Sequence, residues 1–361
     1  MTNDFKDKLI SILFAFILII IMILNIIKKD DKISYTERRQ LEQFPKITFK
    51  SIFDKTLADK LDKYTTDQFI GRDNLRKTKV NIEMITKNNY NNLYIYNDYI
   101  IKELYPLDEK SVINMTNKIN YIKNNYLSNK NIYYSIIPDK NYFINKDNLK
   151  LDYNNLKDIM NKELIDINYI DLFDTLKLDD YYKTDTHWKQ ESLNDVVNKL
   201  SISMNFNVND NYIVKEASSC FKGVYSGQIL ISDVCDKINI LENSDILNST
   251  LYNYETNKFE NIYDMSKVNN SDAYEIYLSG SASLLTIINN NNNSNKNLIV
   301  FRDSYGSSLI PLLISGYNKI TVVDTRYINP KLLNNYIDFN DYQDALFIYN
   351  TMLINESYSL K

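Results

Sequence analysis

A long apolar run near the N-terminus constrains the fold of this chain more than any other feature. Leu9 to Ile27 reads LISILFAFILIIIMILNII and contains no charged side chain, while Lys6, Lys8, Lys28 and Lys29 flank it. A helix of about 19 residues spans the roughly 30 Å hydrocarbon core of a bilayer. The run is longer than the apolar region of a cleaved signal peptide and lacks a small-residue cleavage site. It therefore predicts an uncleaved, single-pass membrane anchor.

The orientation of this anchor does not follow from charge, because lysines flank both of its ends. An N-terminal anchor with a very short leading tail is expected to leave the large C-terminal part outside the cytoplasm. The remainder of the 361-residue chain contains no second run of this length and apolarity. We therefore expect a cell-membrane protein whose large C-terminal part is extracytoplasmic.

Composition excludes several classes of function. The formal net charge is −4, and charges of both signs are interspersed, which argues against nucleic acid as a partner. Cys220 and Cys235 are the only cysteines, and an exported protein can pair them in a disulfide. Two cysteines and one histidine cannot supply an ordinary structural zinc site. We expect no metal and no cofactor.

The chain divides into three predicted regions. Residues 1–32 form the tail and anchor, 33–105 a tether and helical region, and 106–361 an α/β domain with an irregular insertion at about 205–285. Alternating strand and helix patterns in the last region predict a doubly wound parallel sheet, whose site lies beyond the carboxyl ends of the strands. Expected strands are 131–137, 168–172, 298–301, 319–323 and 345–349; expected helices are 58–89 (one or two), 111–126, 153–164, 190–204, 304–314 and 330–336. A strand pair is expected at 93–101 and a polar Asn-rich loop at 289–295.

Ser304 occupies a position typical of a nucleophile. It follows the apolar strand Leu298–Phe301 and precedes a predicted helix. A serine on such a turn is exposed above the sheet, and the backbone N–H groups of the helix start can stabilise an oxyanion. The alternative is that Asp303 or Ser304 only caps the helix, since both residue types are favoured there.

His187 is the only histidine, so it is the only imidazole base that the chain can offer to a serine. Asp185 precedes it by two residues and can orient its ring. The alternative is a structural histidine without a catalytic role. The adjacent Trp188 is the only tryptophan of the chain, and both lie in a loop that leads into a predicted helix, which favours a functional site.

The two motifs together resemble the DHHW family, which is similar to the SGNH-like alginate O-acetylation proteins. They are Asp185-Thr-His-Trp188 and Arg302-Asp-Ser-Tyr-Gly306. Further matches over residues 34–326 are Glu37-Arg38-Arg39 with Phe44-Pro45, Phe69 and Arg72 as F-x-x-R, and Pro138-Asp-Lys140 as P-x-K. The family's second histidine is Thr186 here. The glycine that SGNH proteins have before Asp-Ser is Arg302, which bears on the oxyanion-hole geometry.

The resemblance implies an SGNH-hydrolase-like fold in which Ser304 is the nucleophile, His187 the base and Asp185 the orienting acid. The implied activity is O-acyl transfer, with acetyl as the expected group, to a cell-surface or secreted polysaccharide. A polytopic membrane O-acyltransferase is the implied acyl donor. The same three residues would serve an acetyl-esterase. The alternative from another class is a non-catalytic envelope scaffold that binds glycan.

Five further residues are weaker candidates for substrate binding or oxyanion stabilisation. Arg302, Tyr305 and Trp188 adjoin the predicted catalytic residues, while Lys140 and Arg326 follow predicted strands and can face the same cleft. The alternative for Lys140 and Arg326 is a solvated loop position in an ion pair. The acyl donor, the acceptor and the oligomeric state do not follow from the sequence.

Overall fold

The computed structural model describes residues 3–34, 37, 39–145, 148–230, 234–270, 272–292 and 296–361. Arg38 and the last three residues of the Asn-rich loop therefore lie outside the described residues. The chain contacts form two compact units, Met1–Tyr90 with Gly227–Ser232, and Asn91–Ser226 with Asp233–Lys361. The first division falls after Tyr90, whereas the sequence predicted a boundary after residue 105.

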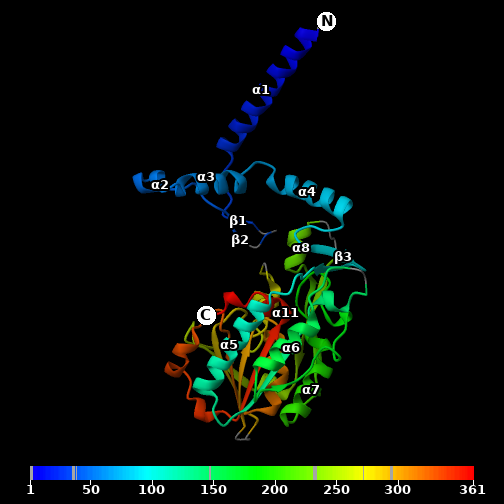
Figure 1. Ribbon diagram of the computed structural model, residues 1–361, viewed down its shortest axis with the longest axis vertical. Helices are drawn as coiled ribbons and strands as arrows, with labels where there is room; N and C mark the ends of the chain where they lie inside the picture. The colour runs from blue at the N-terminus through cyan, green and yellow to red at the C-terminus, as the bar shows by residue number, and fades with distance from the viewer. Residues whose placement is uncertain are drawn as a thin grey trace. The chain divides into compact units, whose positions relative to one another are not determined.

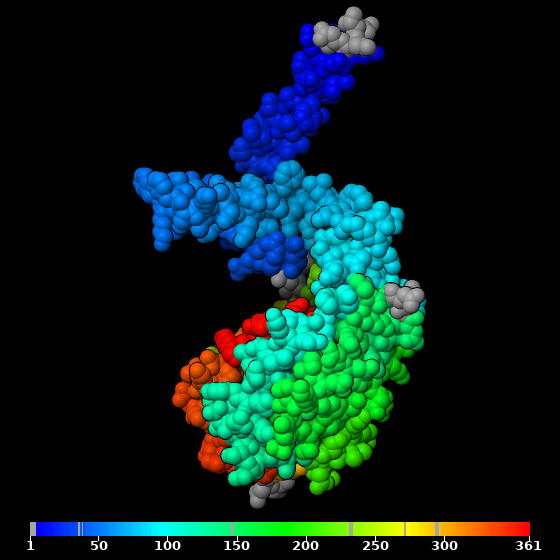
Figure 2. Space-filling view, in the orientation of Figure 1, coloured from blue at the N-terminus to red at the C-terminus, as the bar shows by residue number. Residues whose placement is uncertain are grey.

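The first unit begins with α1 (Asn3–Ile27), which contains the predicted anchor. Its segment Phe5–Ile27 is long and apolar enough to cross a membrane. The apolar side chains of α1 are exposed along its length (Figure 2). Water does not favour such a surface, whereas the hydrocarbon core of a bilayer accepts it.

The rest of the first unit consists of short elements after the anchor. They are β1 (Ile33–Ser34), β2 (Arg39–Gln40), α2 (Phe49–Phe53), α3 (Thr56–Asp67) and α4 (Arg72–Lys87). The stretch predicted as one or two helices is two, because the chain turns at Gly71, whose φ of 71° is in the left-handed region that favours glycine.

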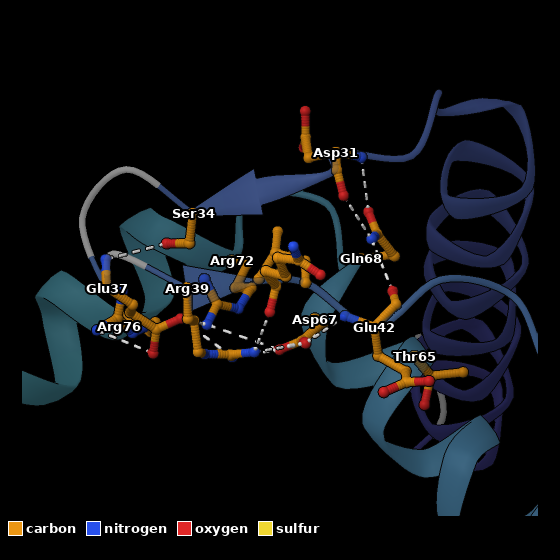
Figure 3. Close-up of polar contacts among 12 residues, drawn as sticks. Asp31, Ser34, Glu37, Arg39, Glu42, Thr65, Asp67, Gln68, Arg72 and Arg76 are labelled. Atoms are coloured by element: carbon orange, nitrogen blue, oxygen red, sulfur yellow. Dashed lines mark hydrogen bonds and ion pairs between the residues drawn. The ribbon is translucent and has the colours of Figure 1, made fainter. Parts of the chain in front are cut away.

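Two of the family-like motifs contact each other within this unit. Arg39 makes a two-pronged ion pair with Asp67, through Nη1 to Oδ2 at 2.8 Å and Nη2 to Oδ1 at 2.5 Å. Arg72 pairs with Glu37, and Arg76 Nη2 lies 3.3 Å from Glu37 Oε1 (Figure 3). Hydrogen bonds from Arg39 hold the pKa of the Asp67 carboxyl below its usual range. The network joins the segment after the anchor to α3 and α4.

The second unit is built on an eight-stranded sheet. The strands are β5 (Asn131–Ile137), β6 (Asn168–Tyr169), β9 (Ser249–Asn253), β10 (Lys258–Glu260), β11 (Leu284–Asn289), β12 (Asn297–Arg302), β13 (Lys319–Val323) and β14 (Asp344–Asn350). Their order is β10-β9-β11-β13-β12-β14-β5-β6. The pairs from β13 to β6 are parallel, and those from β10 to β13 are antiparallel. The predicted α/β sheet is confirmed.

Both faces of this sheet are covered, because side chains alternate along each strand. In β12, Leu298 and Val300 join one core with α7 (Asn194–Met204), while Ile299 and Phe301 join the other. The second core contains α5 (Glu109–Tyr126) and α6 (Tyr153–Glu163), which cover the same face of the sheet (Figure 1). A run of apolar residues without alternation in polarity, as in β12, is typical of a strand buried on both faces.

Shorter elements complete the second unit. They are β3 (Leu93–Tyr96), β4 (Tyr99–Lys102), β7 (Ile213–Phe221), β8 (Asp236–Glu242), α9 (Ser244–Leu247), α10 (Gly306–Leu309) and α11 (Thr351–Asn355). The helix α8 (Val224–Ile229) begins in this unit and ends in the first. The 3-10 helices are η1 (Lys140–Phe143), η2 (Leu178–Asp180), η3 (Gln190–Ser192), η4 (Met265–Lys267), η5 (Ala273–Ile276), η6 (Ile310–Gly316), η7 (Pro330–Asn335), η8 (Phe339–Asp341) and η9 (Ser357–Ser359).

Several predictions need correction. The helix expected at 330–336 is the 3-10 helix η7, and the strand expected at 168–172 is only Asn168–Tyr169. The helix expected at 304–314 is instead the single turn α10 followed by the 3-10 helix η6, because Pro311 lacks the N–H that would continue an α-helix. The insertion at about 205–285 is less irregular than predicted, since β9, β10 and the first two residues of β11 lie in it and belong to the main sheet. β7 and β8 form a separate antiparallel pair.

A disulfide links the two strands of this pair. Cys220, in β7, is bonded to Cys235, which directly precedes β8, with their Cα atoms 5.1 Å apart. The sequence placed both cysteines in an irregular loop, whereas Cys220 lies in a regular strand. The bond closes the segment that contains α8.

Candidate active site

Ser304 lies on the turn between β12 and α10, at the carboxyl end of a central parallel strand. The turn is held by the buried carboxylate of Asp303. Its Oδ1 accepts the Tyr305 N–H at 2.9 Å, and its Oδ2 accepts the Asn350 N–H at 2.7 Å from the end of β14. Burial raises the pKa of Asp303. Asp303 therefore fixes the Ser304 turn to the neighbouring strand.

His187 lies in a tight loop that precedes η3. Backbone hydrogen bonds close this loop, from Tyr182 N–H to His187 O at 3.0 Å and from Lys189 N–H to Asp180 O at 2.7 Å. Within it, Asp185 Oδ1 accepts the backbone N–H of His187 at 3.0 Å. This local Asx turn explains why a spacing of two residues brings the carboxylate to the imidazole.

The structure brings Ser304, His187 and Asp185 into one hydrogen-bonded chain. His187 Nε2 lies 2.8 Å from Ser304 Oγ, and His187 Nδ1 lies 2.6 Å from Asp185 Oδ1. With Nδ1–H donated to the carboxylate, Nε2 carries the lone pair that accepts the serine proton. Burial decreases along the chain, because Asp185 is 1% exposed, His187 is 8% exposed and Ser304 is only partly buried. The hydroxyl is thus the accessible end.

The charge of Asp185 is stabilised although the group is buried. Burial alone would raise its pKa, but His187 and the hydrogen bonds to the carboxylate overcome that effect and hold the pKa below its usual range. One of these bonds is donated to Oδ2 by the Val224 N–H at 2.9 Å. Asp185 therefore remains ionised beside the ring, as stabilising an imidazolium requires.

Aromatic rings hold the imidazole from two sides. The Tyr274 ring stacks on it with centroids 3.9 Å apart and planes at 9°. The Tyr305 ring lies 4.9 Å away, and its hydroxyl donates to Thr186 O at 2.6 Å. These contacts fix both the ring plane and the loop that carries it.

Gly223 allows a second segment to approach Asp185 closely. A Cβ at this position would lie 2.3 Å from Asp185 Cβ and 2.5 Å from both Asp185 Cα and Thr184 O. The Gly223 N–H also donates to Thr184 Oγ1 at 2.8 Å. From the other side, Asp236 accepts the Lys183 N–H at 2.7 Å and the Thr184 N–H at 2.8 Å. The loop that carries Asp185 is thus held between the segment that follows Cys220 and the segment that follows Cys235.

We expect Gly223→Ala to lower turnover roughly 10²-fold, because a displacement of about 1 Å at a catalytic group has an effect of that size. The new methyl group would meet the backbone of the Asp185 loop, which must move. The measurement is kcat for acetyl-ester hydrolysis. Ser219→Ala, in the exposed part of β7, is the control. Unchanged turnover in Gly223→Ala would show that the close approach is not required.

Three of the weaker candidates are buried and already bonded. Arg302 donates to Asp303 O at 3.2 Å and to Gly280 O at 3.2 Å. Trp188 Nε1–H lies 3.0 Å from Tyr305 O and 2.9 Å from Ser308 Oγ. The structure gives these residues and Tyr305 positions that support the site, not positions that face a substrate. The Ser304 N–H, in contrast, donates no hydrogen bond within the described residues and is suitably placed to stabilise an oxyanion.

Lys140 and Arg326 lie in different surroundings. Arg326 pairs with Asp324 through Nε at 2.9 Å and Nη2 at 2.6 Å, in agreement with the ion-pair alternative. Lys140 is only 3% exposed, and its Nζ donates to Tyr182 O at 3.0 Å and to Lys183 O at 3.3 Å. The sequence predicted that Lys140 lies either in the cleft or at a solvated loop position, and its burial agrees with neither position. It braces the base of the His187 loop.

Burial lowers the pKa of Lys140 to about 7, although Asp185 and Asp236 oppose the shift. Between pH 7 and the ordinary lysine pKa of about 10.4, the unfolded chain holds a proton that the folded chain has lost, so stability rises with pH. Lys140→Met removes this dependence. From pH 6 to pH 9 we expect the stability of Lys140→Met relative to wild type to fall by on the order of 2 kcal/mol.

Thermal unfolding of the two proteins at pH 6, 7.5 and 9 measures this change. Lys331→Met, at an exposed position, provides the matched control. A constant difference between Lys140→Met and wild type across the pH range would contradict the prediction.

The described residues include no group of three or more His, Cys, Asp or Glu side chains arranged to hold a metal ion. The hydrogen bond between His187 and Ser304 is the arrangement by which a histidine can activate a serine. Sequence reasoning missed Tyr274 and Asp236. Tyr274 is one of 30 tyrosines and one of many buried ones, so nothing in the sequence marked it. The one signal for Asp236 in the sequence is its position directly after Cys235.

Solved structures share the fold of about three quarters of this chain. A DHHW family protein from Eubacterium siraeum matches with a TM-score of 0.62 and 18% identity, over 75% of this chain and 94% of that protein. This chain therefore has the fold of that protein. PatB1 of Bacillus cereus has the same fold, with a TM-score of 0.60 and 18% identity over 73% of this chain and 96% of PatB1. PatB1 has also been solved with a sulfonyl adduct, at a TM-score of 0.59.

The O-acetyltransferase domain of Pseudomonas putida AlgJ matches less well, with a TM-score of 0.45 and 11% identity over 73% of this chain and 92% of that domain. This similarity is too low to support a conclusion. No protein-family model and no curated protein sequence matches the chain. The predicted α/β fold with a mostly parallel central sheet is confirmed.

Proposed function

We propose that this chain is a membrane-anchored, extracytoplasmic O-acyltransferase with acetyl as its acyl group. The observation that carries the proposal is the chain of short contacts from Asp185 through His187 to the accessible Ser304 hydroxyl. Ser304 Oγ attacks an acyl donor while His187 Nε2 takes its proton, giving an acyl-serine and releasing the donor's leaving group. His187 passes this proton to the leaving group. In the second step His187 takes the proton of an acceptor hydroxyl as the acceptor oxygen attacks the acyl carbon, and gives it to Ser304 Oγ as the acyl–serine bond breaks.

The acceptor that we propose is a polysaccharide hydroxyl at the cell surface or in the secreted material. A sugar hydroxyl is a weak nucleophile that His187 can activate in the second half-reaction, as it activates Ser304 in the first. The anchor α1 supports a location at the membrane. We further propose that a polytopic membrane O-acyltransferase supplies the acyl group, because an enzyme of this kind would deliver activated acyl groups to the outer side of the membrane.

A sulfonyl fluoride probe tests this proposal, and the PatB1 structure with a sulfonyl adduct supports its choice. We expect the wild-type chain to be labelled at Ser304 and Ser304→Ala to remain unlabelled. Ser307→Ala replaces a buried serine of the same turn and is the matched control, which should be labelled. A wild-type preparation that is folded but unlabelled would favour the glycan-binding scaffold.

Transfer and hydrolysis use the same three residues, so the acceptor must separate them. With an acetyl-ester donor, an added oligosaccharide should gain acetyl groups in the wild type and not in Ser304→Ala. Release of acetate without acetylated sugar would identify an esterase.

A further inference from the structure

An exposed apolar patch follows the anchor in the first unit. Its five large side chains are between 51% and 85% exposed: Phe44, Ile47, Phe49, Ile52 and Phe53. We call these five residues the aromatic patch. They fall within ten residues of sequence, and the last three belong to α2, whose start is fixed by the capping box of Thr48. So many exposed apolar side chains in one short segment are uncommon on a protein surface that faces only water.

Hydrogen bonds connect the end of α3, which follows the patch in the chain, to the end of the anchor. Asn25, in the last turn of α1, accepts the Ile70 N–H through Oδ1 at 2.8 Å. Gln68 and Asp31 are joined twice, from Asp31 N–H to Gln68 Oε1 and from Gln68 Nε2 to Asp31 O, each at 2.9 Å (Figure 3). The carboxyl end of α3 is therefore fixed directly beside the end of the apolar span.

The patch itself connects to the same point. The Phe44 ring packs edge-on against Tyr64 with centroids 5.3 Å apart, and the Tyr64 hydroxyl donates to Asp30 Oδ1 at 3.1 Å. Asp30 lies three residues after Ile27, where the span ends. Figure 1 shows α2 and α3 running across the end of α1, not along its axis. A helix in this position lies at the level where hydrocarbon meets headgroups.

The charges around the patch suit that level. Lys46 and Lys50 are interleaved with its apolar residues, and Asp54 and Lys55 directly follow them. Phenylalanine on one face and lysine on the other is typical of helices that lie in the membrane interface, where the lysines contact anionic headgroups. The arginines of the neighbouring network are in contrast paired with Glu37 and Asp67, so that network serves as a brace for α3 and α4.

We propose that the aromatic patch is inserted into the interface of the membrane that holds α1. The occupant of this surface is therefore lipid, with acyl chains against the phenylalanine rings and anionic headgroups against the lysines. The α2 segment then acts as a second attachment point beside the anchor and fixes the orientation of α3 at the membrane surface. The inference rests on the anchoring part of the proposed function and is independent of the chemistry at Ser304.

Tryptophan substitution in the full chain tests the proposal. Phe53→Trp is reconstituted in vesicles of phosphatidylcholine and phosphatidylglycerol, with and without phosphatidylcholine brominated on its acyl chains. The wild-type emission, from Trp188 alone, is subtracted. We expect bromine to remove about half of the added emission, because interfacial side chains lie about 5–10 Å into the headgroup and acyl boundary.

Two matched variants make the outcome decisive. Phe14→Trp, within α1, should be quenched if the anchor is inserted, and Ile202→Trp, an exposed position of α7, should not be quenched. Quenching of Phe14→Trp without quenching of Phe53→Trp would overturn only the inference about the aromatic patch. If neither tryptophan is quenched, the proposal that α1 is a membrane anchor is overturned as well. A third outcome is that the Phe53→Trp emission is blue-shifted but not quenched, and that the blue shift is lost when the protein is diluted. This would mean that a second copy of the chain covers the patch, and it would also overturn the proposal.

Discussion

Replacement of His187 by Gln is expected to lower kcat for acetyl-ester turnover by roughly 10⁶-fold, the size of effect seen when the base of a serine triad is removed. Glutamine keeps a polar side chain of similar length but cannot take the proton of Ser304 and return it. The fold should persist, because Tyr274 can still pack against the amide and the loop is closed by backbone hydrogen bonds.

The measurement is a comparison of kcat and of thermal unfolding for His187→Gln and wild type in the same detergent. Ile202→Gln introduces the same side chain at an exposed position of α7 and should leave turnover unchanged. Substantial turnover by a folded His187→Gln protein would remove His187 from the mechanism.

Asp185→Asn is expected to lower kcat by roughly 10⁴-fold through the wrong tautomer of His187. Asp185 accepts hydrogen bonds at both oxygens, from the imidazole at Oδ1 and from the Val224 N–H at Oδ2. An amide has only one acceptor. If its oxygen faces Val224, its NH2 takes the place of Oδ1, where it opposes the His187 backbone N–H and favours the imidazole proton on Nε2, which blocks transfer from Ser304.

If the amide has the opposite orientation, its NH2 faces the Val224 N–H, and two buried donors oppose each other at a cost of about 1–3 kcal/mol. The variant is therefore expected to lose stability or the productive tautomer, and kcat falls in either case. Asp195→Asn, at an exposed position early in α7, makes the same change without these contacts. Wild-type turnover in Asp185→Asn would show that the carboxylate does not set the tautomer.

The parts of the fold that the sequence predicted well are those where burial dictates residue type. β5 and β13 have the predicted bounds, because a strand buried on both faces requires an apolar run. β10, with the sequence Lys-Phe-Glu, is a short edge strand whose pairing depends on β9, and no local pattern marks it. The predicted α-helix after Ser304 is too long because it continues past Pro311.

The contrast within the site has a similar cause. His187 and Asp185 could be paired from sequence because their contact is local, and Ser304 because strand ends carry nucleophiles. Tyr274 reaches His187 only through the tertiary fold, so its role could not be predicted. Lys140 was placed at the correct strand end, but its burial depends on Tyr182 and Lys183, whose carbonyls lie more than 40 residues further along the chain.

The disulfide has a consequence for when the site is complete. Cys220 lies three residues before Gly223, and Cys235 directly precedes Asp236, so the bond fastens together the two segments that hold the Asp185 loop. Such bonds form in oxidising compartments and stay open in the reducing cytoplasm. In a chain that is exported as proposed, the disulfide that holds the Asp185 loop forms only after translocation. Oxidation then acts as a maturation step, and reductant added to the finished protein should reverse it.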